Sequence, residues 1–137
     1  AEAEKKAKEE QAKKEAAANN AAVKEVDDLT LMAAIIYCEA GAEPYEAQLA
    51  VGAVVMNRVR SGRYPNTIAD VIYAPGQFPY AAAKIHEVMA RGVKASCLQA
   101  AQEAINGASN VGSFTHFKSA RSAVAGAHIV IGGHVFY

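Results

Sequence analysis

The chain has 137 residues, a length typical of a single domain, and about half of them (52%) are apolar, which suffices for a hydrophobic core at this size. Fourteen Lys and Arg balance fourteen Asp and Glu, so the chain lacks the basic excess typical of nucleic-acid or anionic-membrane binding. No stretch approaches the roughly 20 apolar residues of a membrane span. The chain begins with Ala and shows no signal-peptide pattern, so we expect it to be a piece of a longer protein.

Residues 1–18 contain only Ala, Glu, Lys and Gln, with Glu and Lys repeatedly four residues apart in the favourable helical orientation, as in Glu2–Lys6 and Glu10–Lys14. Because no large apolar residue lies at coiled-coil spacing, the pattern favours a solvated helical linker over a coiled coil. We therefore divide the chain into a linker, residues 1–26, and a globular domain, residues 27–137. The domain should fold without the linker.

The first predicted helix is LTLMAAIIYCEA, residues 29–40, capped by Asp27 or Asp28 and ended by Gly41 in the left-handed conformation. A second helix should run over residues 45–60. Its apolar residues cover more than one face, which is typical of a central, buried helix.

The middle of the chain predicts shorter elements. The sequence favours a helix over residues 67–74 capped by Asn66, a loop at PGQFP (75–79), a helix near 81–90, and a helix over 96–106 capped by Ser96 and ended by Gly107.

In the last part of the sequence the pattern of apolar residues changes from one typical of helices to one typical of strands. Ser113–Phe117 and Ala127–Tyr137 read as strands, and Gly132-Gly133 between β-branched runs predicts a two-residue hairpin turn. A helical lobe followed by a small antiparallel sheet is an α+β fold.

Cys38 and Cys97 form no CxxC motif, and we expect two free, mostly buried thiols rather than a disulfide. The hairpin register places His128 and His134 on opposite sides of the sheet. With no HExxH motif and no Cys/His cluster, we expect neither a metal nor a cofactor.

Glu39 is the carboxylate that stands out, because it follows Ile35, Ile36, Tyr37 and Cys38 at the end of the most apolar helix. A carboxyl held against apolar groups has a raised pKa and can act as an acid at neutral pH. Alternatively, Glu39 reaches solvent at the helix end, and the residues alone leave both interpretations open. Glu43 need not share a face with it, so the sequence offers no second carboxylate of the usual glycosidase pair.

Two segments carry side chains suited to binding sugars, namely the PGQFP loop and FTHF (114–117). Aromatic rings can stack on sugar faces and short polar groups can hydrogen-bond to hydroxyls. Equally, these aromatic rings can fill the core between sheet and helices. The candidate substrate-binding residues are Gln77, Phe78, Thr115, His116 and Phe117.

Three runs together carry a resemblance: residues 35–78 (IIYCEAGAEPYEAQLAVGAVVMNRVRSGRYPNTIADVIYAPGQF), residues 96–112 (SCLQAAQEAINGASNVG) and residues 131–137 (IGGHVFY). In this order and spacing they resemble the SleB-type cell wall hydrolases, the spore-cortex-lytic enzymes. The resemblance covers about residues 29–137. Pro79 departs from the family, which usually has a small hydroxyl residue there, and this departure bears on substrate preference.

The resemblance implies a lysozyme-like domain that cleaves peptidoglycan in spore cortex or vegetative wall, outside the cytoplasm. It implies that Glu39 is the acid/base of a lytic transglycosylase, which needs one carboxylate. Peptidoglycan glycan strands would be the partner of a monomeric domain. A water-using muramidase and an inactive peptidoglycan-binding module are the alternatives, and the intact Glu39 speaks against the second.

Overall fold

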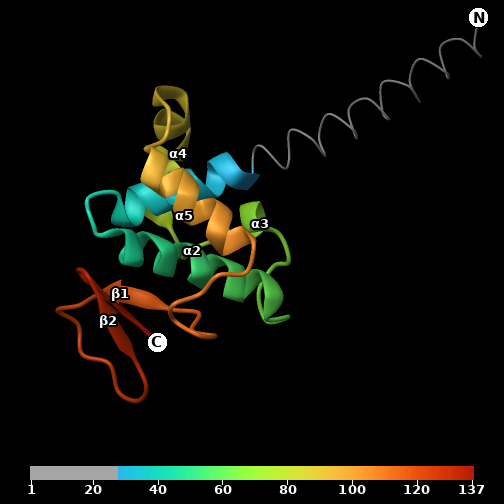
Figure 1. Ribbon diagram of the computed structural model, residues 1–137. Coiled ribbons are helices and arrows are strands. Elements are labelled where there is room, and N and C mark those ends of the chain that lie inside the picture. Colours follow the sequence, from blue (N-terminus) through green and yellow to red (C-terminus); the bar gives the residue numbers. More distant parts are fainter. Residues whose placement is uncertain (1–27) are drawn as a thin grey trace, which may run out of the picture.

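The computed structural model describes residues 28–137, with the backbone alone for residues 79–82. The predicted linker and the predicted cap Asp27 lie outside the described residues. Within the described part, five helices pack beside a small sheet (Figure 1). The helices are the first helix (residues 28–40), α2 (Tyr45–Arg60), α3 (Ile68–Ile72), α4 (Pro79–Arg91) and α5 (Ala95–Ile105).

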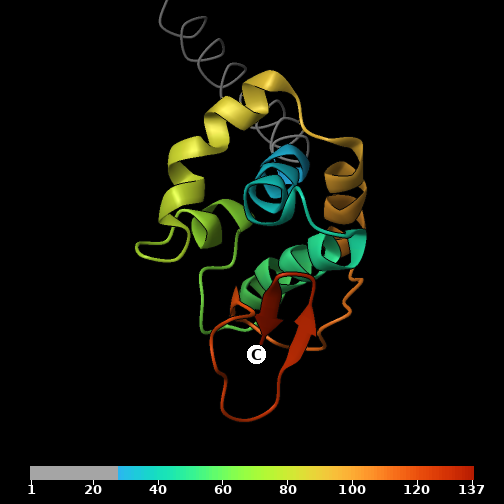
Figure 2. The ribbon, with the colours of Figure 1, turned by 90° about the vertical axis from the view of Figure 1, so that its left-hand side faces the viewer.

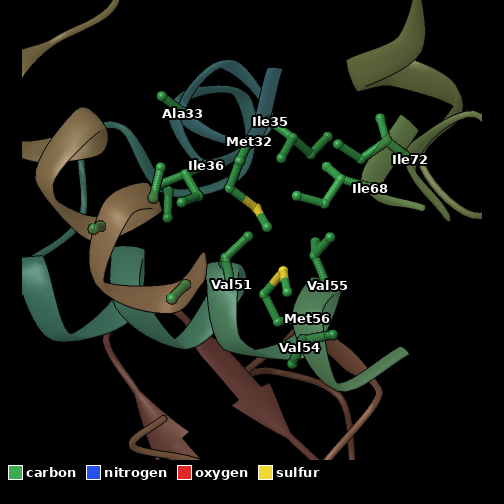
Figure 3. Packing of buried hydrophobic residues seen from close by; sticks show 14 of the residues in the cluster. Met32, Ala33, Ile35, Ile36, Val51, Val54, Val55, Met56, Ile68 and Ile72 are labelled. Atoms are coloured by element: carbon green, nitrogen blue, oxygen red, sulfur yellow. The ribbon is translucent and has the colours of Figure 1, made fainter. Parts of the chain in front are cut away.

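The central position predicted for α2 is confirmed. Its buried residues include Val51, Val54 and Val55. Figure 3 shows the first helix and α3 packed around it, with Met32, Ile35, Ile36, Ile68 and Ile72 directed toward the same core. On another side α5 approaches so closely that a Cβ on Gly52 would lie 2.8 Å from the Ala104 Cβ.

Helix starts differ from the prediction by one or two residues. Thr67, not Asn66, caps α3, because its hydroxyl accepts a hydrogen bond from the Asp70 backbone N–H at 3.1 Å. Pro79 is the first residue of α4 rather than the end of the loop, a position that suits a residue without an N–H. Ser96 lies inside α5, whose N-cap is Lys94.

Gly41 ends the first helix for a different reason from the one predicted. Its φ angle is not in the left-handed region, whereas the predicted terminator Gly107 does have a positive φ of 105°. A Cβ on Gly41 would lie 2.5 Å from the Tyr37 carbonyl oxygen and 2.8 Å from a Tyr37 ring carbon. Glycine is therefore required at position 41 by the close approach of Tyr37.

The sheet is antiparallel, with order β1-β3-β2, and consists of β1 (Phe117–Ser119), β2 (Ile129–Ile131) and β3 (His134–Phe136). Ile131 pairs with His134, which confirms the predicted hairpin and its register. The sheet lies on the side of α2 away from the first helix and α4 (Figures 1 and 2).

The prediction of a strand over residues 113–117 is wrong, because β1 begins only at Phe117. Side chains of α2 bind the backbone carbonyls of the preceding segment instead. The Asn57 amide donates to the carbonyls of Gly112 and Phe114 at 2.9 and 2.8 Å, and Arg58 donates to the carbonyl of Thr115 at 2.7 Å. These carbonyls are therefore held by the helix before pairing with β3 starts.

The α+β prediction is confirmed, and Cys38 and Cys97 are both free thiols, as expected. Cys97 is buried, and its thiol lies 3.6 Å from the Gln48 side-chain oxygen as a weak donor.

Candidate active site

Glu39 lies in the last turn of the first helix and is half-buried. Burial raises the pKa of its carboxyl above the ordinary value of 4.5. The structure thus keeps elements of both interpretations left open by the sequence, because the carboxyl is partly desolvated and still reaches the surface at the helix end. A carboxyl of this kind holds a proton to higher pH than an exposed one.

Two cavities meet at Glu39. The sheet cavity, about 300 Å³, lies between the sheet and the loop before α4. The helix-end cavity, about 540 Å³, lies at the end of the first helix and the turn that follows it. Glu39 is the residue that lines both. The sheet cavity is further lined by Arg58, Gln77, Phe78, Phe117, Lys118, Ser119 and His134, and the helix-end cavity by Tyr37, Cys38, Ala40, Gly41, Ala42, Glu43 and Lys94.

Three of the predicted substrate-binding residues, Gln77, Phe78 and Phe117, line the sheet cavity together with Glu39. Phe78 is only 4% exposed and packs on Phe117 with 6.0 Å between ring centroids, so most of its ring belongs to the core. The two side chains thus satisfy both interpretations drawn from the sequence, as core aromatics whose edges form a cavity wall.

Thr115 and His116 do not line either cavity. The Thr115 hydroxyl contacts His116 Nδ1 at 3.0 Å, and the His116 ring stacks on Tyr137 with 5.3 Å between centroids. His116 also contacts the Tyr64 hydroxyl at 3.3 Å. The His116 side chain therefore links the segment after α2 to the C-terminal residue, and the Thr115 hydroxyl contacts the same ring.

Arg58 was not among the predicted site residues, yet it is 5% exposed and lines the sheet cavity. Its Nε donates to the Thr115 carbonyl and its Nη1 donates to Gln77 Oε1, both at 2.7 Å. The guanidinium lies 5.0 Å from the Tyr64 ring centroid and 5.4 Å from that of Phe78. With Gln77 Oε1 held by Arg58, the NH₂ group of the amide remains as a donor at the cavity.

Glu43 and the hairpin turn form a second contact that sequence analysis missed. Glu43 Oε2 accepts a hydrogen bond from the Gly133 backbone N–H at 3.1 Å. A Cβ on Gly132 or on Gly133 would lie 2.5 Å from a Glu43 carboxylate oxygen. Both glycines thus leave room for this contact, and Gly132, with a φ of 58°, also adopts the left-handed conformation of the turn. Burial lowers the pKa of the adjacent His134, although the negative charge of Glu43 acts in the opposite direction.

Over residues 28–137, excluding the side chains of 79–82, no three His, Cys, Asp or Glu side chains come close enough to hold a metal ion. In the same part of the chain, every helix is too short or too polar to cross a membrane.

The cell wall hydrolase family model matches residues 42–137. This chain belongs to the cell wall hydrolase family. The match begins three residues after Glu39, so the first helix, which carries Glu39, lies before the matched residues. Two curated relatives are the spore cortex-lytic enzymes of Oceanobacillus iheyensis and Bacillus subtilis, 48% and 46% identical over 52 residues. That match takes 38% of this chain but 19% and 17% of the relatives, so it spans less than a fifth of their length.

Solved structures extend the similarity to most of the cell wall hydrolase domain. The catalytic domain of the germination-specific lytic transglycosylase SleB from Bacillus anthracis superposes with a TM-score of 0.69 at 32% identity, covering 80% of this chain and 93% of that one. The catalytic domain of the Bacillus cereus SleB protein gives 0.66 at 32% identity, covering 80% and 88%. These matches confirm the resemblance to SleB-type enzymes and the lysozyme-like α+β fold.

Proposed function

We propose that this cell wall hydrolase domain cleaves the bond between N-acetylmuramic acid (MurNAc) and N-acetylglucosamine (GlcNAc) in peptidoglycan, as a lytic transglycosylase with Glu39 as its acid/base. The observation that carries the proposal is the position of Glu39, a carboxyl of raised pKa at the junction of two cavities. A polymer lying across both cavities would pass this carboxyl with sugar units on either side. The name of the B. anthracis structure, a lytic transglycosylase, supports the same reaction.

The reaction needs one proton carrier. Protonated Glu39 donates its proton to the bridging oxygen, the bond from that oxygen to the MurNAc C1 breaks, and GlcNAc leaves with a 4-hydroxyl group. The Glu39 carboxylate then accepts the proton of the MurNAc C6 hydroxyl while the C6 oxygen bonds to C1. The product carries a 1,6-anhydro end, and Glu39 is protonated again. Neither water nor a second carboxylate takes part.

The sheet cavity offers groups that can hold the sugar. The Gln77 NH₂ group is a hydrogen-bond donor whose orientation Arg58 fixes, and Phe117 presents part of a ring. Neutral His134 on the opposite wall adds a further polar group. No cofactor is needed by this chemistry. We propose spore cortex or vegetative peptidoglycan as the substrate and an extracytoplasmic location, because the curated relatives are named spore cortex-lytic enzymes.

A muramidase that uses water is the second candidate, because Glu43 lines the helix-end cavity together with Glu39. An inverting or retaining glycosidase pairs two such carboxylates. The contact of Glu43 with the Gly133 N–H favours a structural role at the hairpin instead.

Mass spectrometry of fragments released from purified cortex and from vegetative peptidoglycan separates the candidates. A transglycosylase gives fragments lighter by one water than those of a muramidase, and Glu43→Gln should reduce the yield far less than Glu39→Gln. Glu46→Gln is the matched control, since Glu46 is exposed and lines neither cavity. Fragments with reducing ends would favour the muramidase, and binding without fragments would favour an inactive module.

A further inference from the structure

The groove that passes Glu39 continues into a third cavity. This outer cavity has a volume of about 320 Å³ and is lined by Tyr37, Val88, Arg91, Gly92 and Lys94. Its lining residues come from the first helix, from the end of α4 and from the segment between α4 and α5. Figure 2 shows how these elements are arranged. Tyr37 and Lys94 also line the helix-end cavity, so the three cavities form a continuous series with Glu39 between the first and the second.

The charge of the lining changes along this series. The helix-end cavity has two carboxylates, Glu39 and Glu43, whereas the outer cavity has two cations, Arg91 and Lys94, and no carboxylate. The Lys94 ammonium donates to the Gly41 carbonyl at 3.2 Å, which holds it at the boundary between the two cavities. The exposed Arg91 is close enough for its positive charge to act on the Cys38 thiol, lowering a pKa that burial raises. The far end of the groove is therefore suited to an anion.

Tyr37 provides a flat wall between these cavities. Its side chain is 39% exposed, although it is large and mostly apolar. Its ring lies close to the turn at Gly41, where a Cβ would be 2.8 Å from a ring carbon. A partly exposed aromatic ring can pack against the apolar face of a sugar and leave its hydroxyl groups to solvent.

We propose that the outer cavity binds the carboxylates of the stem peptide on a muramoyl unit beyond the cleavage point, with Arg91 and Lys94 as the binding residues and Tyr37 under the adjoining sugar. This inference rests on the proposed glycan-strand cleavage. The sugar rings of the strand are uncharged. Its carboxylates are carried by the stem peptides, or by the lactyl group of a muramoyl unit that has lost its peptide. A cationic end to the groove therefore favours strands that keep their peptide carboxylates over strands that lack them.

The test compares two forms of one soluble substrate, peptide-bearing glycan strands and the same strands with their carboxyl groups converted to primary amides. The double variant Arg91→Gln/Lys94→Gln should raise KM about three- to tenfold on the acidic strands, the range expected for two exposed ion pairs. The rise should shrink at high salt, because salt screens exposed charges. Arg63→Gln removes a charge from an exposed residue outside all three cavities and serves as the matched control.

An unchanged KM on acidic strands, or an equal rise on acidic and amidated strands, would overturn the assignment. Strands stripped of peptide by an amidase keep only the lactyl carboxylate. If the double variant had the same effect on stripped strands as on intact ones, the lactyl group would be the ligand and the stem-peptide proposal would be wrong. Failure of the proposed function would look different, because the unaltered domain would then cleave none of the strands.

Discussion

Replacing Arg58 with lysine tests whether the wall of the sheet cavity depends on a guanidinium. Arg58 makes two hydrogen bonds of 2.7 Å, to Thr115 and Gln77, from a side chain that is 5% exposed. Hydrogen bonds to charged groups contribute about 1.5–3 kcal/mol each. Lysine cannot span both acceptors as the planar fork does, and it loses the ring contacts of the guanidinium.

Lysine also keeps the charge, so the desolvation cost of a buried cation is not relieved. Losing one of the two bonds and the ring contacts should therefore lower the free energy of unfolding by about 2–4 kcal/mol. Arg58→Met loses both hydrogen bonds but removes the buried charge. We therefore expect it to lower the free energy of unfolding by no more than Arg58→Lys does.

Urea unfolding followed by circular dichroism gives this free energy directly. Arg60→Lys, two residues on and exposed, is the matched control and should change stability by less than about 0.5 kcal/mol. A double-mutant cycle with Gln77→Ala should show coupling of more than about 0.5 kcal/mol. Two outcomes would refute the role assigned to Arg58. One is a free energy of unfolding for Arg58→Lys within about 0.5 kcal/mol of that of the unaltered protein. The other is effects of Arg58→Lys and Gln77→Ala that simply add.

Further predictions concern the other parts of the site and the core. Gln77→Ala should have a larger effect on kcat/KM for glycan strands than on stability. Unchanged kinetics would mean that Gln77 only stabilises its own loop. Gly52→Ala should destabilise the domain in urea unfolding, because overpacking against Ala104 costs about 1–3 kcal/mol while the gain in helix propensity is about 1 kcal/mol. Glu39→Gln should raise the melting temperature at pH 7 but not near pH 4. The reason is that ionising a carboxyl whose folded pKa is raised costs stability as pH rises above its ordinary value of 4.5. Cleavage activity should be unchanged in EDTA. If EDTA abolished the activity and a divalent ion restored it, the single-carboxyl chemistry would be wrong.

The parts of the fold that the sequence predicts well are those with local signals. Helix α2 follows its predicted limits because Pro44 marks its start and its apolar run is too long for a strand. The hairpin follows from two glycines between β-branched runs. Glu39 was identifiable because an ionisable residue ends a helix whose preceding residues are apolar.

The parts that the sequence did not predict depend on contacts between distant residues. Arg58 bonds to a carbonyl 57 residues away and Glu43 to an N–H 90 residues away. Neither contact has a local signature, although Arg58 continues the buried face marked by Val51 and Val55 at spacings of four and three residues. The wrong strand over residues 113–117 has the same origin, because β-type residues there are held by side chains of α2.

The cleavage rate of Glu39→Gln on purified glycan strands shows whether Glu39 is the acid/base of the reaction. The change is nearly isosteric and removes the only proton carrier that the proposed reaction uses. Loss of a general acid/base lowers rates by about a hundredfold to ten-thousandfold. We predict a loss of at least that size in a protein that remains folded at its usual or a higher melting temperature. Full activity in well-folded Glu39→Gln would show that Glu39 is not the acid/base.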